Sequence, residues 1–147
     1  MKKKKKHNVF MEGAIPSAFI AESIAKHQTK HSIGAHNIFL GQVRADEIDG
    51  KEVTAIEYTT YENMANEKLY EIREKAFEKF DLTCMHIYHS LGKVDVGEVC
   101  FFVFVSSKRR KEVYKATETI VNMVKDEVPI FGKEIFQDET HQWKVNS

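Results

Sequence analysis

Four consecutive cations, Lys108–Lys111, open a predicted helix directly after a predicted strand. A helix start already carries unpaired N–H groups and the positive end of the helix dipole, so cations there are unfavourable by a few tenths of a kcal/mol. Such a local conflict is typical of a functional site. The dipole and the guanidinium groups of Arg109 and Arg110 could together hold a phosphate or a carboxylate. A solvated charged turn, with Ser106 and Ser107 capping the helix, explains the same spacing, so both interpretations stay open.

Two lysines eight positions apart, Lys125 and Lys133, flank an apolar connection that contains Pro129. Lys125 is expected in the last turn of a helix that ends before Pro129, because a proline disfavours the α conformation of the residue before it. Lysines beside apolar walls and other cations often have a lowered pKa, which suits acid–base or covalent chemistry. Taken alone, two lysines at this spacing are more often unrelated surface residues, so that alternative stays open.

The spacing of the histidines and cysteines predicts no metal site. His86 and His89 are three positions apart in a predicted strand, so their side chains face opposite sides. Cys84 and Cys100 are expected as small core residues and cannot fill a four-ligand zinc site. No Ser–His–Asp or Cys–His–Asn order and no glycine-rich phosphate loop are recognisable. We therefore expect no metal ion and no cofactor.

Hydrophobic periodicity indicates the elements that must position these residues. Predicted helices begin near Pro16 and span residues 63–80 and about 108–128, and predicted strands span residues 36–43, 53–60, 83–89 and 99–105, with a last hairpin from 133–136 and 142–145. Asp49-Gly50 predicts a hairpin of the first two strands, Gly41 predicts a bulge, and residues 91–97 predict a turn-rich connection. The pattern is typical of an α+β fold in which two long helices cover a mixed or antiparallel sheet.

Length and composition limit the class of protein. The chain has 147 residues, of which 42% are hydrophobic, enough for one core. No apolar run approaches the roughly 20 residues needed to span a bilayer, and no apolar segment of a secretory signal follows the Lys-rich start. We therefore expect a cytoplasmic protein with a flexible tail over residues 1–8 and a single domain over residues 9–147.

The net charge of zero hides an asymmetry. Removing the five lysines Lys2–Lys6 from the 22 basic residues leaves 17 against 22 acidic residues. An acidic body is a poor general nucleic-acid binder. A nucleic-acid-binding domain that uses Lys2–Lys6 and Lys108–Lys111 remains an alternative, although aromatic and basic residues are not interleaved as such a surface requires.

Several separated stretches, in order, resemble the large (catalytic) subunit of molybdopterin synthase. They are Gly34–Ala35, Phe39–Arg44, Ile56–Tyr58, Tyr61, Met64–Ala65, His89–Val94, Gly97–Glu98, Val103–Arg110, Lys125, Val128–Glu134 and Trp143. The resemblance implies an α/β hammerhead-type fold with an additional small antiparallel β-sheet. It also implies a homodimer that binds a small ubiquitin-like subunit at each end, as a heterotetramer. The implied reaction transfers sulfur from that partner's C-terminal thiocarboxylate to cyclic pyranopterin monophosphate (precursor Z), making the dithiolene of molybdopterin.

The resemblance also implies roles for individual residues. Arg44 matches a pocket arginine, and Arg109 and Arg110 match a substrate-binding stretch that acts in its own subunit or in its dimer mate. Lys125 matches the lysine that stabilises an oxyanion or donates a proton. The partner's tail is expected in a narrow channel, whose implied walls are Phe39, Ile130 and Phe131.

Two positions depart from the family pattern. The family often has histidine in place of Arg109 and lysine in place of Gly132. Lys133 is the only cation in its stretch, and we expect it to take over the missing lysine's role. The departures also favour an alternative: a catalytically degenerate paralogue that binds a ubiquitin-like tail without chemistry.

Overall fold

The computed structural model describes residues 9–145, within which three helices and eight strands alternate. The predicted tail over residues 1–8 lies outside the described residues. The elements are β1 (Phe10–Glu12), α1 (Ser17–His27), β2 (Ala35–Gln42), β3 (Glu47–Ile48), β4 (Lys51–Thr60), α2 (Glu62–Lys79), β5 (Cys84–Asp95), β6 (Val99–Ser107), α3 (Arg110–Glu127), β7 (Ile130–Phe136) and β8 (His141–Trp143). The predicted α+β architecture is confirmed.

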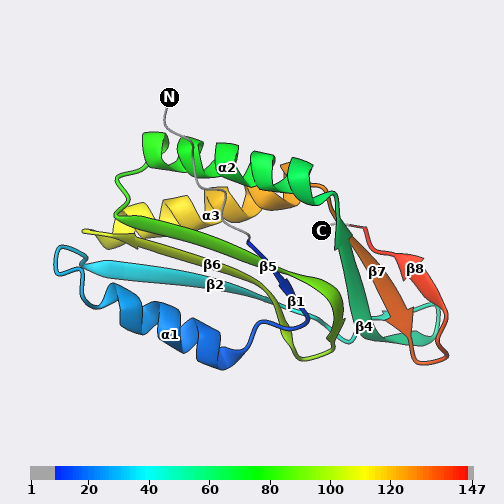
Figure 1. Ribbon diagram of the computed structural model, residues 1–147. Coiled ribbons are helices and arrows are strands. Elements are labelled where there is room, and N and C mark those ends of the chain that lie inside the picture. The colour runs from blue at the N-terminus through cyan, green and yellow to red at the C-terminus, as the bar shows by residue number, and fades with distance from the viewer. Residues whose placement is uncertain (1–8, 146–147) are drawn as a thin grey trace.

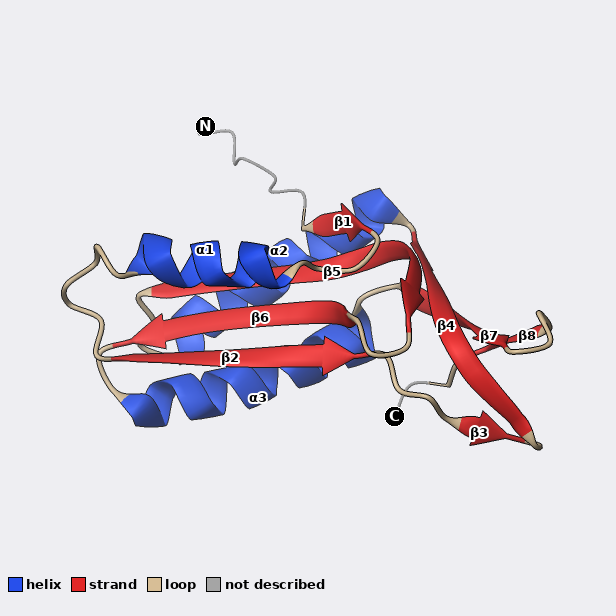
Figure 2. Ribbon diagram, turned by 90° about the horizontal axis from the view of Figure 1, so that it is seen from below, coloured by secondary structure: helices blue, strands red, loops and turns tan. Residues whose placement is uncertain are grey.

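Strand β5 joins two differently oriented parts of the sheet. The strand order is β2-β6-β5-β4-β7-β8, all antiparallel, and β1 adds to β5 in parallel. Residues 84–89 of β5 pair with β6, whereas residues 92–95 pair with β4. Figures 1 and 2 show β4, β7 and β8 turned away from the helix-covered part of the sheet. The expected small antiparallel sheet is therefore present, held in place by the end of β5.

Helices cover both faces of the larger part of the sheet. Helix α1 lies on one face, and α2 and α3 lie on the other (Figure 1). The hydrophobic periodicity that predicts α2 and α3 corresponds to a buried side of each helix: Ala65, Leu69, Ile72 and Ala76, and Val113, Ala116, Ile120, Val121 and Val124. Strand β6 is buried from Cys100 to Ser107. The apolar run of β6 is unbroken because helices cover both faces of this strand, so side chains on both faces are buried.

The predicted hairpin of residues 36–43 and 53–60 is wrong. Strand β2 pairs with β6, and the Asp49-Gly50 turn instead connects the two-residue β3 to β4. A turn signal specifies only its local geometry, whereas the pairing of β2 follows from burying its apolar face beneath a helix. The bulge predicted at Gly41 is confirmed by a register shift between Gly41 and Gln42.

Two further predictions are corrected at element ends. Residues 91–97 are not a turn-rich connection, since β5 continues to Asp95. Ser106 and Ser107 do not cap α3: Arg109 occupies the N-cap without a side-chain hydrogen bond. The Ser106 hydroxyl lies 2.8 Å from His36 Nδ1, and the Ser107 hydroxyl donates to the Asp81 carbonyl at 2.6 Å.

The end of α3 and the last hairpin follow the predictions. Helix α3 ends at Glu127, and Val128 is extended before Pro129. Strands β7 and β8 form the expected hairpin, although β7 already begins at Ile130. None of the helices in residues 9–145 is long and apolar enough to cross a membrane.

Candidate functional site

A pocket of about 590 Å³ lies where the smaller part of the sheet meets the larger one. Its walls come from the end of β2 and the loop after it, from β4, β5 and β6, from the last turn of α3, and from β7 and the end of β8. These elements meet because β5 passes from one part of the sheet to the other, as Figure 1 shows. The pocket therefore collects residues that are spread along the chain from Phe39 to Lys144.

Three cations line this pocket: Arg44, Lys125 and Lys144. Arg44 follows the bulged end of β2, and its guanidinium lies 2.9 Å and 3.3 Å from the two carboxylate oxygens of Asp46. Its side chain is 73% exposed, so the fork to Asp46 orients the group without removing it from solvent. Lys125 lies in the last turn of α3. The structure thus brings Arg44 and Lys125, distant in sequence, to one pocket.

Tyr58, His89 and Cys100 form a polar contact set in the pocket wall. The Tyr58 hydroxyl donates to Cys100 Sγ at 3.4 Å, and the rings of Tyr58 and His89 are 4.9 Å apart, edge to face. His89 Nδ1 lies 2.8 Å from the Ser90 carbonyl oxygen, which can only accept, so Nδ1 carries the proton. Sequence reasoning assigned none of the three a place in the site, because their strands meet only through tertiary pairing.

Burial keeps these three groups neutral. It lowers the pKa of His89 to about 4, with the charge of Lys125 acting in the same direction and the bond to Ser90 opposing both. Burial also raises the pKa of the Cys100 thiol, against the Tyr58 hydrogen bond and the charges of Lys125 and Lys144. The pKa of the Tyr58 hydroxyl is raised, again mainly by burial. The pocket therefore has an uncharged interior, and its charged lining residues are the cations Arg44, Lys125 and Lys144 and the carboxylates Asp46 and Asp126.

The three residues expected to wall a channel, Phe39, Ile130 and Phe131, all line the pocket. Gly132 lies opposite Tyr58 in the β4–β7 register. A Cβ at Gly132 would lie 3.1 Å from Ile56 Cγ2 and 3.3 Å from the Tyr58 ring. The side chains of Ile56 and Tyr58 on β4 therefore occupy the space that a side chain at position 132 would need.

Lys133 is not among the residues that line the pocket. Successive strand side chains face opposite sides, and Lys133 Nζ instead pairs with the Glu57 carboxylate at 3.0 Å. Lys144, which sequence reasoning missed, lines the pocket beside Gly132, and its backbone N–H donates to the Gly132 carbonyl at 2.7 Å. The register of the β7–β8 hairpin, which no local signal specifies, decides which lysine reaches the pocket.

Arg109 and Arg110 lie at the opposite end of α3 from Lys125. Lys125 follows Arg110 by fifteen residues, and a helical rise of about 1.5 Å per residue separates their backbones by about 22 Å. Both arginines are exposed and neither lines the pocket. Within one protomer, the two predicted groups of cations are therefore far apart.

Comparisons with known proteins agree with this fold. The MoaE protein family matches residues 16–127. The molybdopterin synthase catalytic subunit of Bacillus subtilis is 38% identical over 122 residues, which cover 83% of this chain and 76% of the relative. The crystal structure of molybdopterin synthase from Staphylococcus aureus superposes with a TM-score of 0.83 at 28% identity, covering 98% of this chain and 100% of that one. A complex of subunits 1 and 2 of molybdopterin-converting factor from Helicobacter pylori shares the fold, with a TM-score of 0.77 at 20% identity over 91% and 87% of the two chains.

Proposed function

This chain belongs to the MoaE protein family, and we propose that its pocket is the sulfur-transfer site of a molybdopterin synthase catalytic subunit. The relatives with that name support an enzyme of molybdenum cofactor biosynthesis. The observation that carries the proposal is the convergence of Arg44, Lys125 and Lys144 on one pocket with apolar walls. The proposed substrates are the thiocarboxylate end of a small ubiquitin-like subunit and cyclic pyranopterin monophosphate.

The cations reduce the repulsion between the two anionic reactants, which is the main obstacle to this reaction. A thiocarboxylate and a phosphate ester repel each other, and a pocket with three positive groups offsets that repulsion while holding both. Arg44 is exposed and already oriented by Asp46, so it suits binding of the phosphate group. Asp46 and Asp126 also line the pocket, so its three cations exceed its two carboxylates by one charge.

Lys125 is the proposed catalytic group. The tail's sulfur first bonds to a carbon of the pterin substrate and displaces an oxygen group there, which leaves a thioester. Water then attacks the thioester carbonyl, negative charge develops on its oxygen, and the carbon–sulfur bond breaks, so the sulfur stays on the pterin and the tail leaves as a carboxylate. An ammonium at Lys125 stabilises that oxyanion or donates a proton to the departing sulfur. Lys144 supplies the second cation, beside Gly132. Lys133 suits this role less well, because its ammonium group pairs with the Glu57 carboxylate.

The apolar residues Phe39, Ile130 and Phe131 suit the entry of the partner's tail. A tail that ends in two glycines has no side chains, so it fits a narrow passage between such walls. Gly132 lets Ile56 and Tyr58 of β4 pack close to its backbone, so no side chain of residue 132 enters that passage. Binding of the tail there directs its sulfur toward Lys125 and Lys144.

The distance between the two ends of α3 supports a dimer in which each protomer completes the pocket of its mate. About 22 Å separates Arg110 from Lys125 along α3, so we propose that Arg109 and Arg110 bind substrate in the partner protomer's pocket. With one small subunit at each end, the assembly is the proposed heterotetramer.

We also propose that residues 9–147 form a single domain, since β5 is shared by both parts of the sheet. The proposed location of the protein is the cytoplasm, where the free thiols of Cys84 and Cys100 stay reduced.

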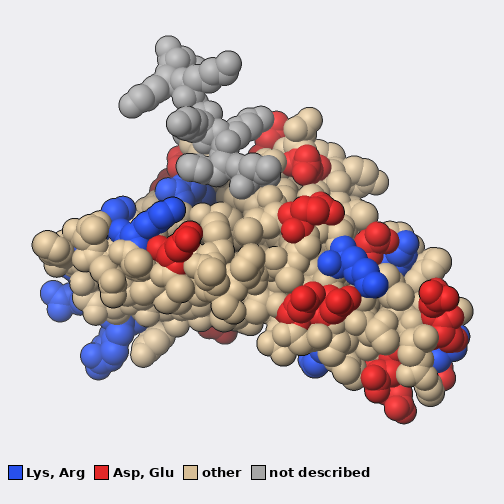
Figure 3. All heavy atoms as spheres, turned by 60° about the horizontal axis from the view of Figure 1, so that its bottom comes forward, with Lys and Arg blue, Asp and Glu red and all other residues tan. Residues whose placement is uncertain are grey.

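The two alternatives have less support. A degenerate paralogue that binds a tail without chemistry is motivated by Arg109 and Gly132, but Lys144 supplies a cation where Gly132 lacks one. For a nucleic-acid-binding domain, a continuous basic surface is needed. On the face seen in Figure 3, separate basic side chains lie at one end, and acidic side chains with a few basic ones lie over the rest.

Reconstitution tests the proposal directly. The purified chain is mixed with thiocarboxylated small subunit and precursor Z, and molybdopterin is measured. We expect product with the thiocarboxylate and none with a small subunit that ends in an ordinary carboxylate. Tail binding without product would favour the degenerate paralogue, and neither binding nor product would reject the assignment.

A further inference from the structure

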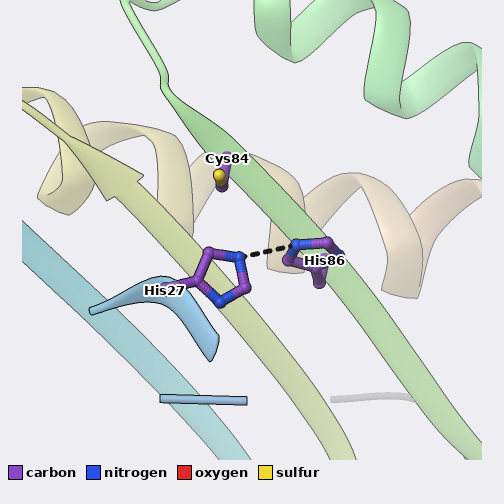
Figure 4. Close-up of side chains that lie close together, drawn as sticks. All are labelled: His27, Cys84 and His86. Atoms are coloured by element: carbon purple, nitrogen blue, oxygen red, sulfur yellow. Dashed lines mark hydrogen bonds between the residues drawn. The ribbon is translucent and has the colours of Figure 1, made fainter. Parts of the chain in front are cut away.

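A second cluster of reactive side chains lies on the α1 face of the sheet. His27, Cys84 and His86 lie close together there, with the two imidazoles facing each other (Figure 4), and one potential ligand atom from each lies within 4.8 Å of the others. The sulfur-transfer pocket lies elsewhere, and none of these three residues lines it. The spacing of His86 and His89 predicted no metal site, and those two residues do face opposite sides. Residue spacing could not predict that His27 takes part, because only the packing of α1 on the sheet brings His27 next to His86.

The local structure explains how the three side chains meet. Cys84 and His86 alternate along β5 and therefore face the same side of the sheet. His27 is in the last turn of α1, which packs on that side. His27 and Cys84 are buried, at 8% and 5% exposure, whereas His86 is half-buried and leaves a route to solvent.

The tautomer of His27 leaves its Nε2 atom available as a ligand. His27 Nδ1 lies 2.7 Å from the Ser23 carbonyl oxygen, which only accepts, so the proton of a neutral ring is on Nδ1. The Nε2 lone pair then points at His86 Nε2, 3.0 Å away. A histidine held through its other nitrogen by a backbone carbonyl is the usual arrangement around protein-bound metals.

Cys84 is the third potential ligand, and its sulfur accepts a hydrogen bond and does not donate one. Lys30 Nζ donates a hydrogen bond to Cys84 Sγ at 3.0 Å. The sulfur thus acts as an acceptor, and a nearby cation offsets the negative charge of a metal-bound thiolate.

We propose that His27, Cys84 and His86 bind a divalent transition metal, with Zn²⁺ the best match. Zn²⁺ takes tetrahedral sites of imidazole and thiolate, and bond lengths of about 2.0–2.3 Å place ligand atoms about 3.3–3.6 Å apart. The 3.0 Å separation of the two Nε2 atoms is close to that value, whereas the set as a whole spans up to 4.8 Å. Binding therefore needs the Cys84 sulfur to move toward the imidazoles by about 1 Å. Binding replaces the contact between the imidazoles, moves the proton of the neutral His86 ring from Nε2 to Nδ1, and releases the thiol proton. Water fills the fourth position on the open His86 side.

Titration with Co²⁺ tests the site, because Co²⁺ takes Zn²⁺ positions and reports sulfur ligation by a charge-transfer band. We expect the chelator-treated chain to bind one equivalent with that band and with the visible spectrum of a four-coordinate ion, and Zn²⁺ to displace it. Cys84→Ser should abolish the band. His86→Gln should weaken binding by about 10-fold or more, and its half-buried position makes it the variant that best preserves the fold.

Matched controls replace the same residue types elsewhere. Cys100→Ser removes the other buried thiol, and His141→Gln removes an exposed histidine of β8; both should keep the Co²⁺ spectrum. Zn²⁺ should raise the melting temperature of the unaltered chain but not that of His86→Gln. Lack of stoichiometric binding, or binding that survives both Cys84→Ser and His86→Gln, would overturn the proposal. None of these measurements depends on sulfur transfer.

Discussion

The backbone N–H of Lys144 donates to the carbonyl oxygen of Gly132 at 2.7 Å, which sets a lysine of the last hairpin beside the pocket position that has no side chain. Lys133, the next residue along the chain from Gly132, pairs with Glu57 instead. The two lysines belong to one hairpin, so they form a matched pair for separating a role in the pocket from a role in the hairpin.

Lys144→Ala should lower kcat/KM for molybdopterin formation by about 10-fold or more, since it removes one of three charges that hold anionic reactants. Lys133→Ala, which removes a half-exposed ion pair, should change it by less than about 3-fold. Steady-state kinetics with the thiocarboxylated small subunit measure both. The opposite ranking would return the role to Lys133.

Lys125→Ala should lower kcat by about 10² to 10³-fold, as expected when one oxyanion-stabilising donor is lost. Binding of the small subunit, measured by calorimetry, should change little, because the apolar walls Phe39, Ile130 and Phe131 remain. Lys125→Arg keeps the charge and should recover part of the rate. Unchanged turnover of Lys125→Ala would reject its catalytic role.

Arg110 and Lys125 should complement each other across the dimer. If Arg110 serves its mate's pocket, Arg110→Ala and Lys125→Ala homodimers are each impaired in both pockets. A mixed dimer of the two variants then has one pocket with both residues intact. After subunit exchange, a random mixture should recover about a quarter of the activity of the unaltered protein. No recovery in verified mixed dimers would mean that Arg110 acts within its own protomer or not at all.

His89 should make the protein less stable in mild acid. Burial lowers its pKa from 6.5 to about 4, so between these pH values the unfolded chain binds a proton that the folded chain does not. The free energy of unfolding should therefore fall as the pH drops from 6.5 toward 4, by at most about 1.4 kcal/mol per pH unit from this residue. The effect fades as the pH rises above 6.5, where the neutral form of His89 increasingly predominates in the unfolded chain as well.

Urea unfolding at pH 7 and pH 5, with and without His89→Gln, measures that contribution. The variant should lose less stability than the unaltered chain between the two pH values, whatever its stability at pH 7. His141→Gln, at an exposed position, should leave the pH dependence unchanged. An equal loss in His89→Gln and in the unaltered chain would contradict a buried, neutral His89.

Local sequence signals predicted the elements well wherever they depend on short-range order. The apolar periodicity of α2 and α3 reports which side of each helix is buried, and Pro129 ends α3 through its own covalent geometry. The bulge at Gly41 is also a local property. The Asp49-Gly50 signal predicted the wrong partner strand for β2, because it specifies a turn and not which strands flank that turn.

The chain's sequence by itself determined the helices, the apolar strands and, through family resemblance, the membership of Arg44 and Lys125 in one pocket. Tertiary structure alone decided that Lys144 and not Lys133 reaches this pocket, and that His27 meets Cys84 and His86. The physical reason is that side-chain direction alternates along a strand, so a neighbour's identity depends on register and helix placement. Both are set by burial of apolar surface across the whole fold, which no short stretch of residues encodes.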